Sequence, residues 1–173
     1  VKPLEVAMAV ENGADEVDIV LNVGRMLTGE YDEAANEVEV IRTEMDDDVV
    51  LKVIIESGAL KTPELIRKAS LLSMLAGADF VKTSTGKIDV AATPEAAVVM
   101  CQAIRDYYDK TGRKVGFKAA GGVRTAEDAA LYYTIVEEIL GKEWLTTELF
   151  RIGASSAANN ILSAIEGSEV KYF

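Results

Sequence analysis

Short apolar segments alternate with longer amphipathic ones along the whole chain. Five of the segments resemble strands, because they are brief, rich in β-branched residues and almost continuously hydrophobic. Strands of this kind are typical of a parallel sheet that is covered on both faces. The predicted strands span residues 16–22, 49–56, 80–84, 115–119 and 149–152.

Helices are predicted between these strands from their start and stop signals. The runs 62–64 and 93–95 both read Thr-Pro-Glu, which offers an N-cap, a proline in the first turn and an early acid. Gly77 and Gly112 lie just past the expected ends of these two helices. With their caps, the predicted helices occupy residues 3–12, 31–45, 62–77, 93–112, 125–141 and 155–165.

Regular alternation of helix and strand, in units of about 30 residues, indicates an α/β fold. Two architectures fit this order, a doubly wound sheet and a (β/α)8 TIM barrel. Residues 1–173 contain no linker or low-complexity tract, so we expect a single domain. Five strands cannot close an eight-stranded barrel, and the sequence starts inside a helical segment. We therefore expect a (β/α)8 barrel of which this chain supplies about five strands, with the N-terminal strands missing.

Four predicted strands carry a charged residue between apolar neighbours, namely Asp18, Lys52, Lys82 and Lys118. A charge in a buried strand is costly to desolvate unless it is paired or has a shifted pKa. Their occurrence in successive strands predicts that the four side chains converge in one interior. There the lysines would lower one another's pKa, and a neutral, desolvated lysine can form a Schiff base with a carbonyl group. A structural network of ion pairs without chemistry is the alternative interpretation.

Composition narrows the possible chemistry. The 173 residues include no histidine, which excludes a histidine base and a histidine-ligated zinc or iron site. A net charge of -11 argues against nucleic acid or an anionic membrane as partner, and no apolar stretch is long enough to predict a membrane span. The single cysteine, Cys101, falls in a helical pattern, where we expect it to pack in the core, and it fits a cytoplasmic location.

The loops after the last three strands are candidates for binding phosphate. They are rich in glycine and hydroxyl residues, and two of them lead directly into helices. Glycines let backbone N–H groups approach an anion, and a helix N-terminus favours negative charge. Late loops of (β/α)8 barrels commonly bind phosphate, although ordinary turns have the same composition. The candidate residues are Gly86, Lys87, Gly121, Gly122, Arg124, Gly153, Ser155 and Ser156.

Several of these segments resemble the deoxyribose-phosphate aldolase family, and the resemblance extends from about Gly13 to the final helix. The resemblance implies a class I aldolase with a (β/α)8 barrel and no cofactor or metal. Such an enzyme interconverts 2-deoxy-D-ribose 5-phosphate with acetaldehyde and D-glyceraldehyde 3-phosphate through a lysine Schiff base. The matching segments are residues 16–18, 51–56, 78–86, 116–124 and 151–156.

The resemblance also implies individual roles. Lys82 would form the Schiff base, and Lys118 would lower its pKa and exchange protons. Asp18 would assist proton transfer, with Lys52 as its supporting partner. The five strands would be the fourth to eighth of the barrel. Some members use a tyrosine at the extreme C-terminus, whereas Tyr172 is the penultimate residue here.

Two other functions remain open at this point. One is a different Schiff-base aldolase or transaldolase that acts on another phosphosugar. The other is a phosphosugar-binding domain without catalysis, although the presence of both lysines and the aspartate argues against it. In each case the partner is a small phosphosugar, and a homodimer is possible for a barrel of this type.

Overall fold

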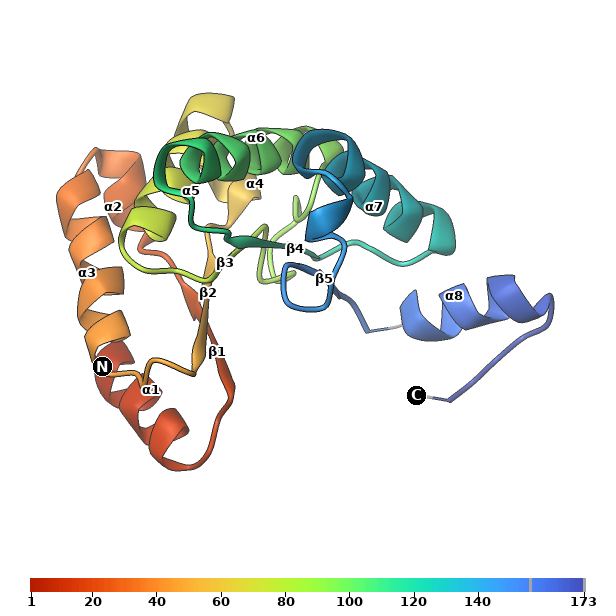
Figure 1. Cartoon of the computed structure of the whole chain (residues 1–173), viewed down its shortest axis with the longest axis horizontal. Coiled ribbons are helices and arrows are strands. Elements are labelled where there is room, and N and C mark those ends of the chain that lie inside the picture. Colours follow the sequence, from red (N-terminus) through yellow and green to blue (C-terminus); the bar gives the residue numbers. More distant parts are fainter. Residues whose placement is uncertain (156, 173) are drawn as a thin grey trace.

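The computed structural model describes residues 1–155 and 157–172, which form a five-stranded parallel sheet with helices along one side (Figure 1). The strands follow one another across the sheet in chain order, each parallel to the next. A doubly wound sheet would reverse its strand order at a switch point, whereas a barrel keeps it. The expected partial (β/α) barrel is therefore confirmed. Its strands are β1 (Glu16–Val20), β2 (Val50–Ile54), β3 (Phe80–Lys82), β4 (Gly116–Ala120) and β5 (Phe150–Gly153).

Six of the helices correspond to the predicted ones, and the structure adds three short ones. The six are α1 (Lys2–Glu11), α3 (Tyr31–Thr43), α5 (Pro63–Leu75), α6 (Pro94–Thr111), α7 (Ala126–Leu140) and α8 (Ala157–Glu166). The additional ones are α2 (Val23–Thr28), α4 (Ser57–Leu60) and the 3-10 turn η1 (Lys142–Trp144). Segments this short contain too few turns for a helical period to show in the sequence.

The first three strands are shorter than predicted, β3 because it ends at Lys82 and not at residue 84. Leu21 and Ile55 lie just past the strand ends, yet both are buried. Their N–H groups still donate to neighbouring carbonyls, Leu21 to Ile54 and Ile55 to Lys82. The apolar pattern extends past the strand ends because these residues stay in the core, so hydrophobicity alone could not locate the ends.

Threonine caps hold the starts of three helices as the sequence predicted. Thr62 and Thr93 accept hydrogen bonds from the backbone N–H groups three residues ahead. Thr125 does the same for Asp128, and the Asp128 carboxylate accepts in return from the Thr125 N–H, which completes a capping box. These caps place the helix starts in the loops that follow β2, β3 and β4.

The two faces of the sheet differ in character. Side chains alternate between the faces along each strand, and Leu51, Val53, Val81 and Phe117 are fully buried beneath the helices. Cys101 is also fully buried in α6, which confirms its predicted place in the core, and burial raises the pKa of its thiol. The other face of the sheet carries the charged residues. Among the described residues, no helix has the length and apolar character needed to cross a bilayer.

The sheet is strongly curved. Neighbouring strands lie about 4.8 Å apart, so β1 and β5 of a flat sheet would be separated by roughly 19 Å. However, the Arg151 guanidinium of β5 donates to the Glu16 carboxylate of β1 at 2.9 and 3.2 Å. The two outer strands must therefore curl toward each other. This curvature turns the charged face into a concave interior.

Candidate active site

Strand register gathers the predicted charges on the concave face. Asp18 lies opposite Lys52 in the β1–β2 pair, and Lys82 lies opposite Lys118 in the β3–β4 pair. Because side chains alternate between faces, residues two positions apart in a strand share a face. Opposite partners in adjacent parallel strands also point the same way. Local sequence thus sets each side chain's face, and the register sets its neighbours.

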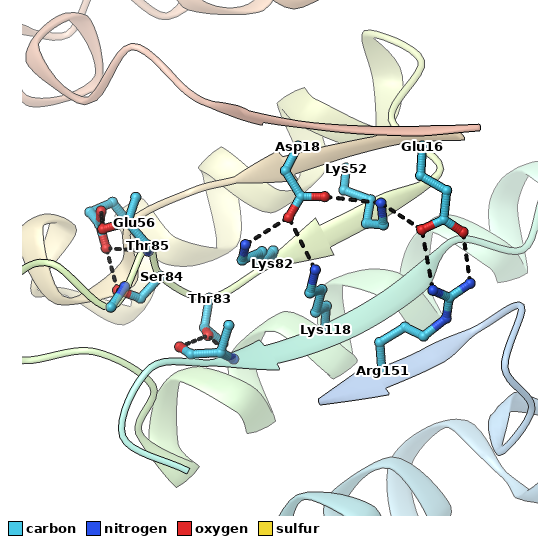
Figure 2. A network of polar contacts seen from close by, with 12 residues as sticks. Glu16, Asp18, Lys52, Glu56, Lys82, Thr83, Ser84, Thr85, Lys118 and Arg151 are labelled. Carbon is cyan, nitrogen blue, oxygen red and sulfur yellow. Dashed lines mark hydrogen bonds and ion pairs between the residues drawn. The ribbon is translucent and has the colours of Figure 1, made fainter. Parts of the chain in front are cut away.

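Asp18 is the centre of this cluster (Figure 2). Its Oδ2 accepts from the Lys82 Nζ at 2.7 Å and from the Lys118 Nζ at 3.1 Å. Its Oδ1 lies 2.9 Å from the Nζ of Lys52, whose side chain is only 4% exposed. The predicted convergence of all four residues is confirmed by these contacts. Two candidate nucleophiles therefore share a single carboxylate oxygen.

The cluster shifts the pKa of Asp18 downward. Partial burial favours the protonated carboxyl and would raise its pKa. Hydrogen bonds from Lys82, Lys52 and Lys118 outweigh that effect and hold the pKa well below its ordinary value. Asp18 is consequently ionised at neutral pH and can accept protons or hydrogen bonds but not supply a proton.

The pKa of Lys118 is also lowered. Desolvation by burial is the largest cause and lowers the pKa of its ammonium. The Asp18 carboxylate opposes this shift, and the charges of Lys82 and Lys52 add to the lowering. A lysine with a lowered pKa exchanges protons more readily near neutral pH, which suits an acid–base role.

The structure adds two residues that the sequence analysis did not select. The Glu16 carboxylate lies 2.8 Å from the Lys52 Nζ. The two terminal nitrogens of Arg151 each donate a hydrogen bond to one oxygen of the same carboxylate. The hydrogen bonds from Arg151 and Lys52 lower the pKa of Glu16. Glu16 precedes Asp18 by two positions and so shares its face, a signal that was readable in the sequence. Arg151 is on the same face of β5, opposite Lys118.

A cavity of about 470 Å³ opens beside the lysine cluster. Both Lys82 and Lys118 line it, together with the three loops predicted to bind phosphate. The lining includes every predicted phosphate residue that the structure describes, namely Gly86, Lys87, Gly121, Gly122, Arg124, Gly153 and Ser155. Ser156 lies outside the described residues.

A model of the DeoC/LacD family of aldolases matches residues 1–158. The chain belongs to this family. It is 49% identical to deoxyribose-phosphate aldolase of Mus musculus and 47% identical to that of Homo sapiens, each over 157 residues. These alignments cover 91% of this chain and 49% of each relative, so the chain spans about half the length of the curated relatives it matches.

Solved structures of the same type share the fold. A protein from Coccidioides immitis, described as a candidate deoxyribose-phosphate aldolase, superimposes with a TM-score of 0.77 at 32% identity. The match covers 94% of this chain and 57% of that one. A structure described as "QR15, an Aldolase" gives a TM-score of 0.73 at 28% identity, covering 95% of this chain and 66% of the other.

Glycines and hydroxyl side chains shape the backbone of the loops that line the cavity. Gly86 and Gly121 have left-handed φ angles of 73° and 88°. A Cβ on Gly121 would come within 2.6 Å of the Ala91 Cβ, so no side chain fits there. The N–H groups of Gly86 and Lys87, by contrast, are occupied by the hydroxyls of Ser84 and Thr85.

Two further sequence predictions concern the periphery of the aldolase site. The C-terminal segment lies beyond α8, away from the sheet (Figure 1), and Tyr172 is 76% exposed. The structure therefore gives Tyr172 no contact with the lysine cluster among the described residues. Within residues 1–155 and 157–172, no group of three or more acidic, cysteine or histidine side chains is arranged to hold a metal ion.

Proposed function

We propose that this chain, as a single aldolase domain over residues 1–173, carries the Schiff-base site of a 2-deoxy-D-ribose 5-phosphate aldolase. The reaction would be reversible cleavage to D-glyceraldehyde 3-phosphate and acetaldehyde. One observation carries the proposal: Lys82 and Lys118 both contact the Asp18 carboxylate beside a cavity lined by glycine-rich loops. The family match and the deoxyribose-phosphate aldolase relatives support the same substrate.

In the first stage, the neutral amine of Lys82 attacks the C1 aldehyde of the open-chain sugar. The resulting carbinolamine loses water and becomes a protonated imine. Lys118 and the ionised Asp18 are positioned to relay protons with water, because the Asp18 Oδ2 lies 2.7 Å from the Lys82 Nζ and 3.1 Å from the Lys118 Nζ. In this proposal Lys52 and Glu16 hold Asp18 in place.

In the second stage, the C3 hydroxyl loses its proton and the C2–C3 bond breaks. The bonding electrons move toward the imine nitrogen and leave an enamine on Lys82, while C3 becomes the aldehyde of glyceraldehyde 3-phosphate. Protonation of the enamine at C2 restores an imine. Water then hydrolyses that imine, releases acetaldehyde and frees Lys82 for another cycle.

The phosphate would bind at the far loops. Lys87 and Arg124 line the cavity together with the Gly121–Gly122 turn and Ser155, which together offer positive charge and hydrogen-bond donors. Binding energy from a remote phosphate can position the reacting carbons at the lysine. This arrangement accounts for a basic cavity in a chain whose net charge is -11.

Borohydride trapping in the full-length protein tests the proposal. Incubation with deoxyribose 5-phosphate and borohydride should fix the substrate carbons on Lys82, as identified by peptide mass spectrometry. Lys82→Leu should abolish both trapping and turnover. Lys110→Leu, at an exposed lysine near the end of α6, is the matched control and should behave like the unmodified protein.

The same experiment separates the alternatives. Trapping on Lys118 or persistent trapping in Lys82→Leu would overturn the assignment of the nucleophile. Faster turnover of another phosphosugar would indicate a different Schiff-base aldolase or a transaldolase. Binding of phosphosugar without any turnover would indicate a non-catalytic domain. A homodimeric state, a cytoplasmic location and the absence of nucleic-acid partners remain predictions from the sequence.

A further inference from the structure

Glu56 is a buried carboxylate that lies outside the cluster around Asp18. It lies two residues past the end of β2 and is only 6% exposed. No lysine or arginine forms an ion pair with it in the part of the chain that the structure describes. A buried carboxylate without a cation is costly unless hydrogen bonds satisfy its oxygens. The origin of those hydrogen bonds therefore indicates its role.

Among the described residues, every hydrogen bond to the Glu56 carboxylate comes from the loop that follows Lys82 (Figure 2). Oε1 accepts from the Ser84 hydroxyl and from the Thr85 N–H at 3.1 Å. Oε2 accepts from the Thr85 hydroxyl at 2.6 Å. An ionised carboxylate is an acceptor only, so it matches these three donors.

The hydroxyls of Ser84 and Thr85 also accept hydrogen bonds from the backbone of the next residues. Each hydroxyl has one proton, which it donates to Glu56, so its lone pairs are left to accept. Ser84 Oγ accepts from the Gly86 N–H at 3.0 Å, and Thr85 Oγ1 accepts from the Lys87 N–H at 3.1 Å. Chained hydrogen bonds of this kind reinforce one another. The Glu56 carboxylate thereby sets the shape of the backbone through Lys87.

The backbone at Glu56 is itself unusual. Its φ of 54° is in the left-handed region, which a residue other than glycine enters at a cost of about 1–3 kcal/mol. Neighbouring bonds hold it there, because the N–H groups of Ile55 and Ser57 donate to the carbonyls of Lys82 and Thr83. Glycine would remove the strain but also the carboxylate. A strained glutamate at this point indicates that its side chain is required.

The ordered loop faces the proposed phosphate site. Thr85, Gly86 and Lys87 line the cavity, whereas Glu56 and Ser84 do not. Glu56 is therefore placed to act on a bound anion only through the loop. In addition, the loop begins directly after Lys82, so the same contacts relate the Schiff-base lysine to the phosphate end of the cavity.

We infer that Glu56 is a positioning residue that holds the loop of residues 83–87 in the form that receives the substrate phosphate. The inference rests on the proposed function and deepens it. Loss of this carboxylate should weaken recognition of the phosphate while leaving the chemistry at Lys82 intact. The effect should consequently depend on whether the substrate carries a phosphate.

The test compares 2-deoxyribose 5-phosphate with unphosphorylated 2-deoxyribose in the full-length protein. Glu56→Gln replaces one acceptor oxygen with a donor, so at least one of the three hydrogen bonds is lost. We expect kcat/KM for the phosphorylated sugar to fall about tenfold or more, mainly through KM, as for a lost hydrogen bond to a charged group. For 2-deoxyribose, kcat/KM should change by less than about twofold, because this sugar has no phosphate. The dissociation constant of inorganic phosphate, measured by calorimetry, should rise by about the same factor as KM.

A second pair of variants covers the case in which Glu56→Gln does not fold. Ser84→Ala removes one donor to Glu56 and the acceptor of the Gly86 N–H, which are the first two links of the same chain, although Ser84 itself does not line the cavity. It should lower the ratio of kcat/KM for the phosphorylated sugar to kcat/KM for 2-deoxyribose, as Glu56→Gln should. Ser70→Ala is the matched control, because Ser70 is also a fully buried serine but its hydroxyl bonds within α5. Thermal melting of each variant reports folding.

Each outcome decides the inference. The positioning role would be refuted if a folded variant lost kcat/KM equally with both sugars. It would also be refuted if the ratio of the two kcat/KM values did not change. If the unmodified protein turns over neither sugar, the proposed function fails. Phosphate calorimetry still tests Glu56 in that case, since weaker phosphate binding in Glu56→Gln or Ser84→Ala supports the role and unchanged binding refutes it.

Discussion

At the scale of single residues, the site depends on one carboxylate that neutralises several ammonium groups. Asp18 contacts three lysines, and one of them, Lys52, is almost wholly buried. Sequence reasoning reached these four residues because a charge between apolar neighbours in a strand is conspicuous. It could not reveal that Lys82 and Lys118 bond to the same oxygen, because that distance depends on how the strands are paired.

Asp18→Asn tests this residue-scale arrangement. We expect it to destabilise the protein by about 2–3 kcal/mol at pH 7, because it leaves desolvated lysines without a counter-charge. The pKa of Asp18 is lowered on folding, so its stabilising contribution is present above the unfolded pKa near 3.9 and is lost as pH falls through the folded pKa. The difference in the free energy of unfolding between the unmodified protein and Asp18→Asn should therefore narrow below about pH 4.

Denaturant unfolding at several pH values measures this effect. Asp106→Asn is a suitable control, because Asp106 pairs with Arg67 on the surface and such pairs contribute about 0–1 kcal/mol. A stability gap for Asp18→Asn that stays constant from pH 7 to below pH 3 would contradict the account.

At the scale of elements, adjacent strands pack closely beside the lysines that we propose to be catalytic. Gly116 of β4 lies opposite Phe80 of β3, and a Cβ at Gly116 would come within 2.3 Å of the Phe80 ring. The Arg151 guanidinium lies over the same ring at 5.6 Å from its centroid. Phe80 precedes Lys82 by two residues, and Gly116 precedes Lys118 by two residues. The Phe80 ring therefore leaves no room for a side chain at position 116, between the strands that carry Lys82 and Lys118.

Gly116→Ala should displace the Phe80 ring and destabilise the protein by about 1–3 kcal/mol, the usual cost of overpacking. Equilibrium unfolding in urea would show the change as a lower midpoint. A double variant with Phe80→Leu should recover part of the loss. Gly24→Ala in α2 is the control, because a Cβ there meets only ordinary contacts and should have little effect. Equal stability of Gly116→Ala and Gly24→Ala would contradict the packing argument.

At the scale of the whole molecule, the five strands form part of a barrel rather than a closed one. Within the described residues, β1 pairs only with β2, and β5 pairs only with β4. Unpaired strand edges favour association with other chains, and closure of a barrel removes them. The curvature brings Glu16 and Arg151 into contact but does not pair the backbones of β1 and β5.

We therefore expect the 173-residue chain, when expressed by itself, to self-associate and to show no aldolase turnover. Size-exclusion chromatography with light scattering, alongside a deoxyribose 5-phosphate assay, would measure both properties. A monodisperse monomer that turns over the substrate would show that the open sheet is sufficient for function.

Local sequence patterns predicted the order of the strands and longer helices, the α/β class and the identity of the four interior charges. They could do so because hydrophobic period, capping residues and unusual charges are local properties of the chain. The tertiary structure decided which of these residues touch. Register brought Lys82 and Lys118 to one oxygen of Asp18, curvature brought Arg151 to Glu16, and Glu56 met a loop that follows it by about thirty residues. Those contacts join distant segments, so they depend on the packing of the sheet and not on any local pattern.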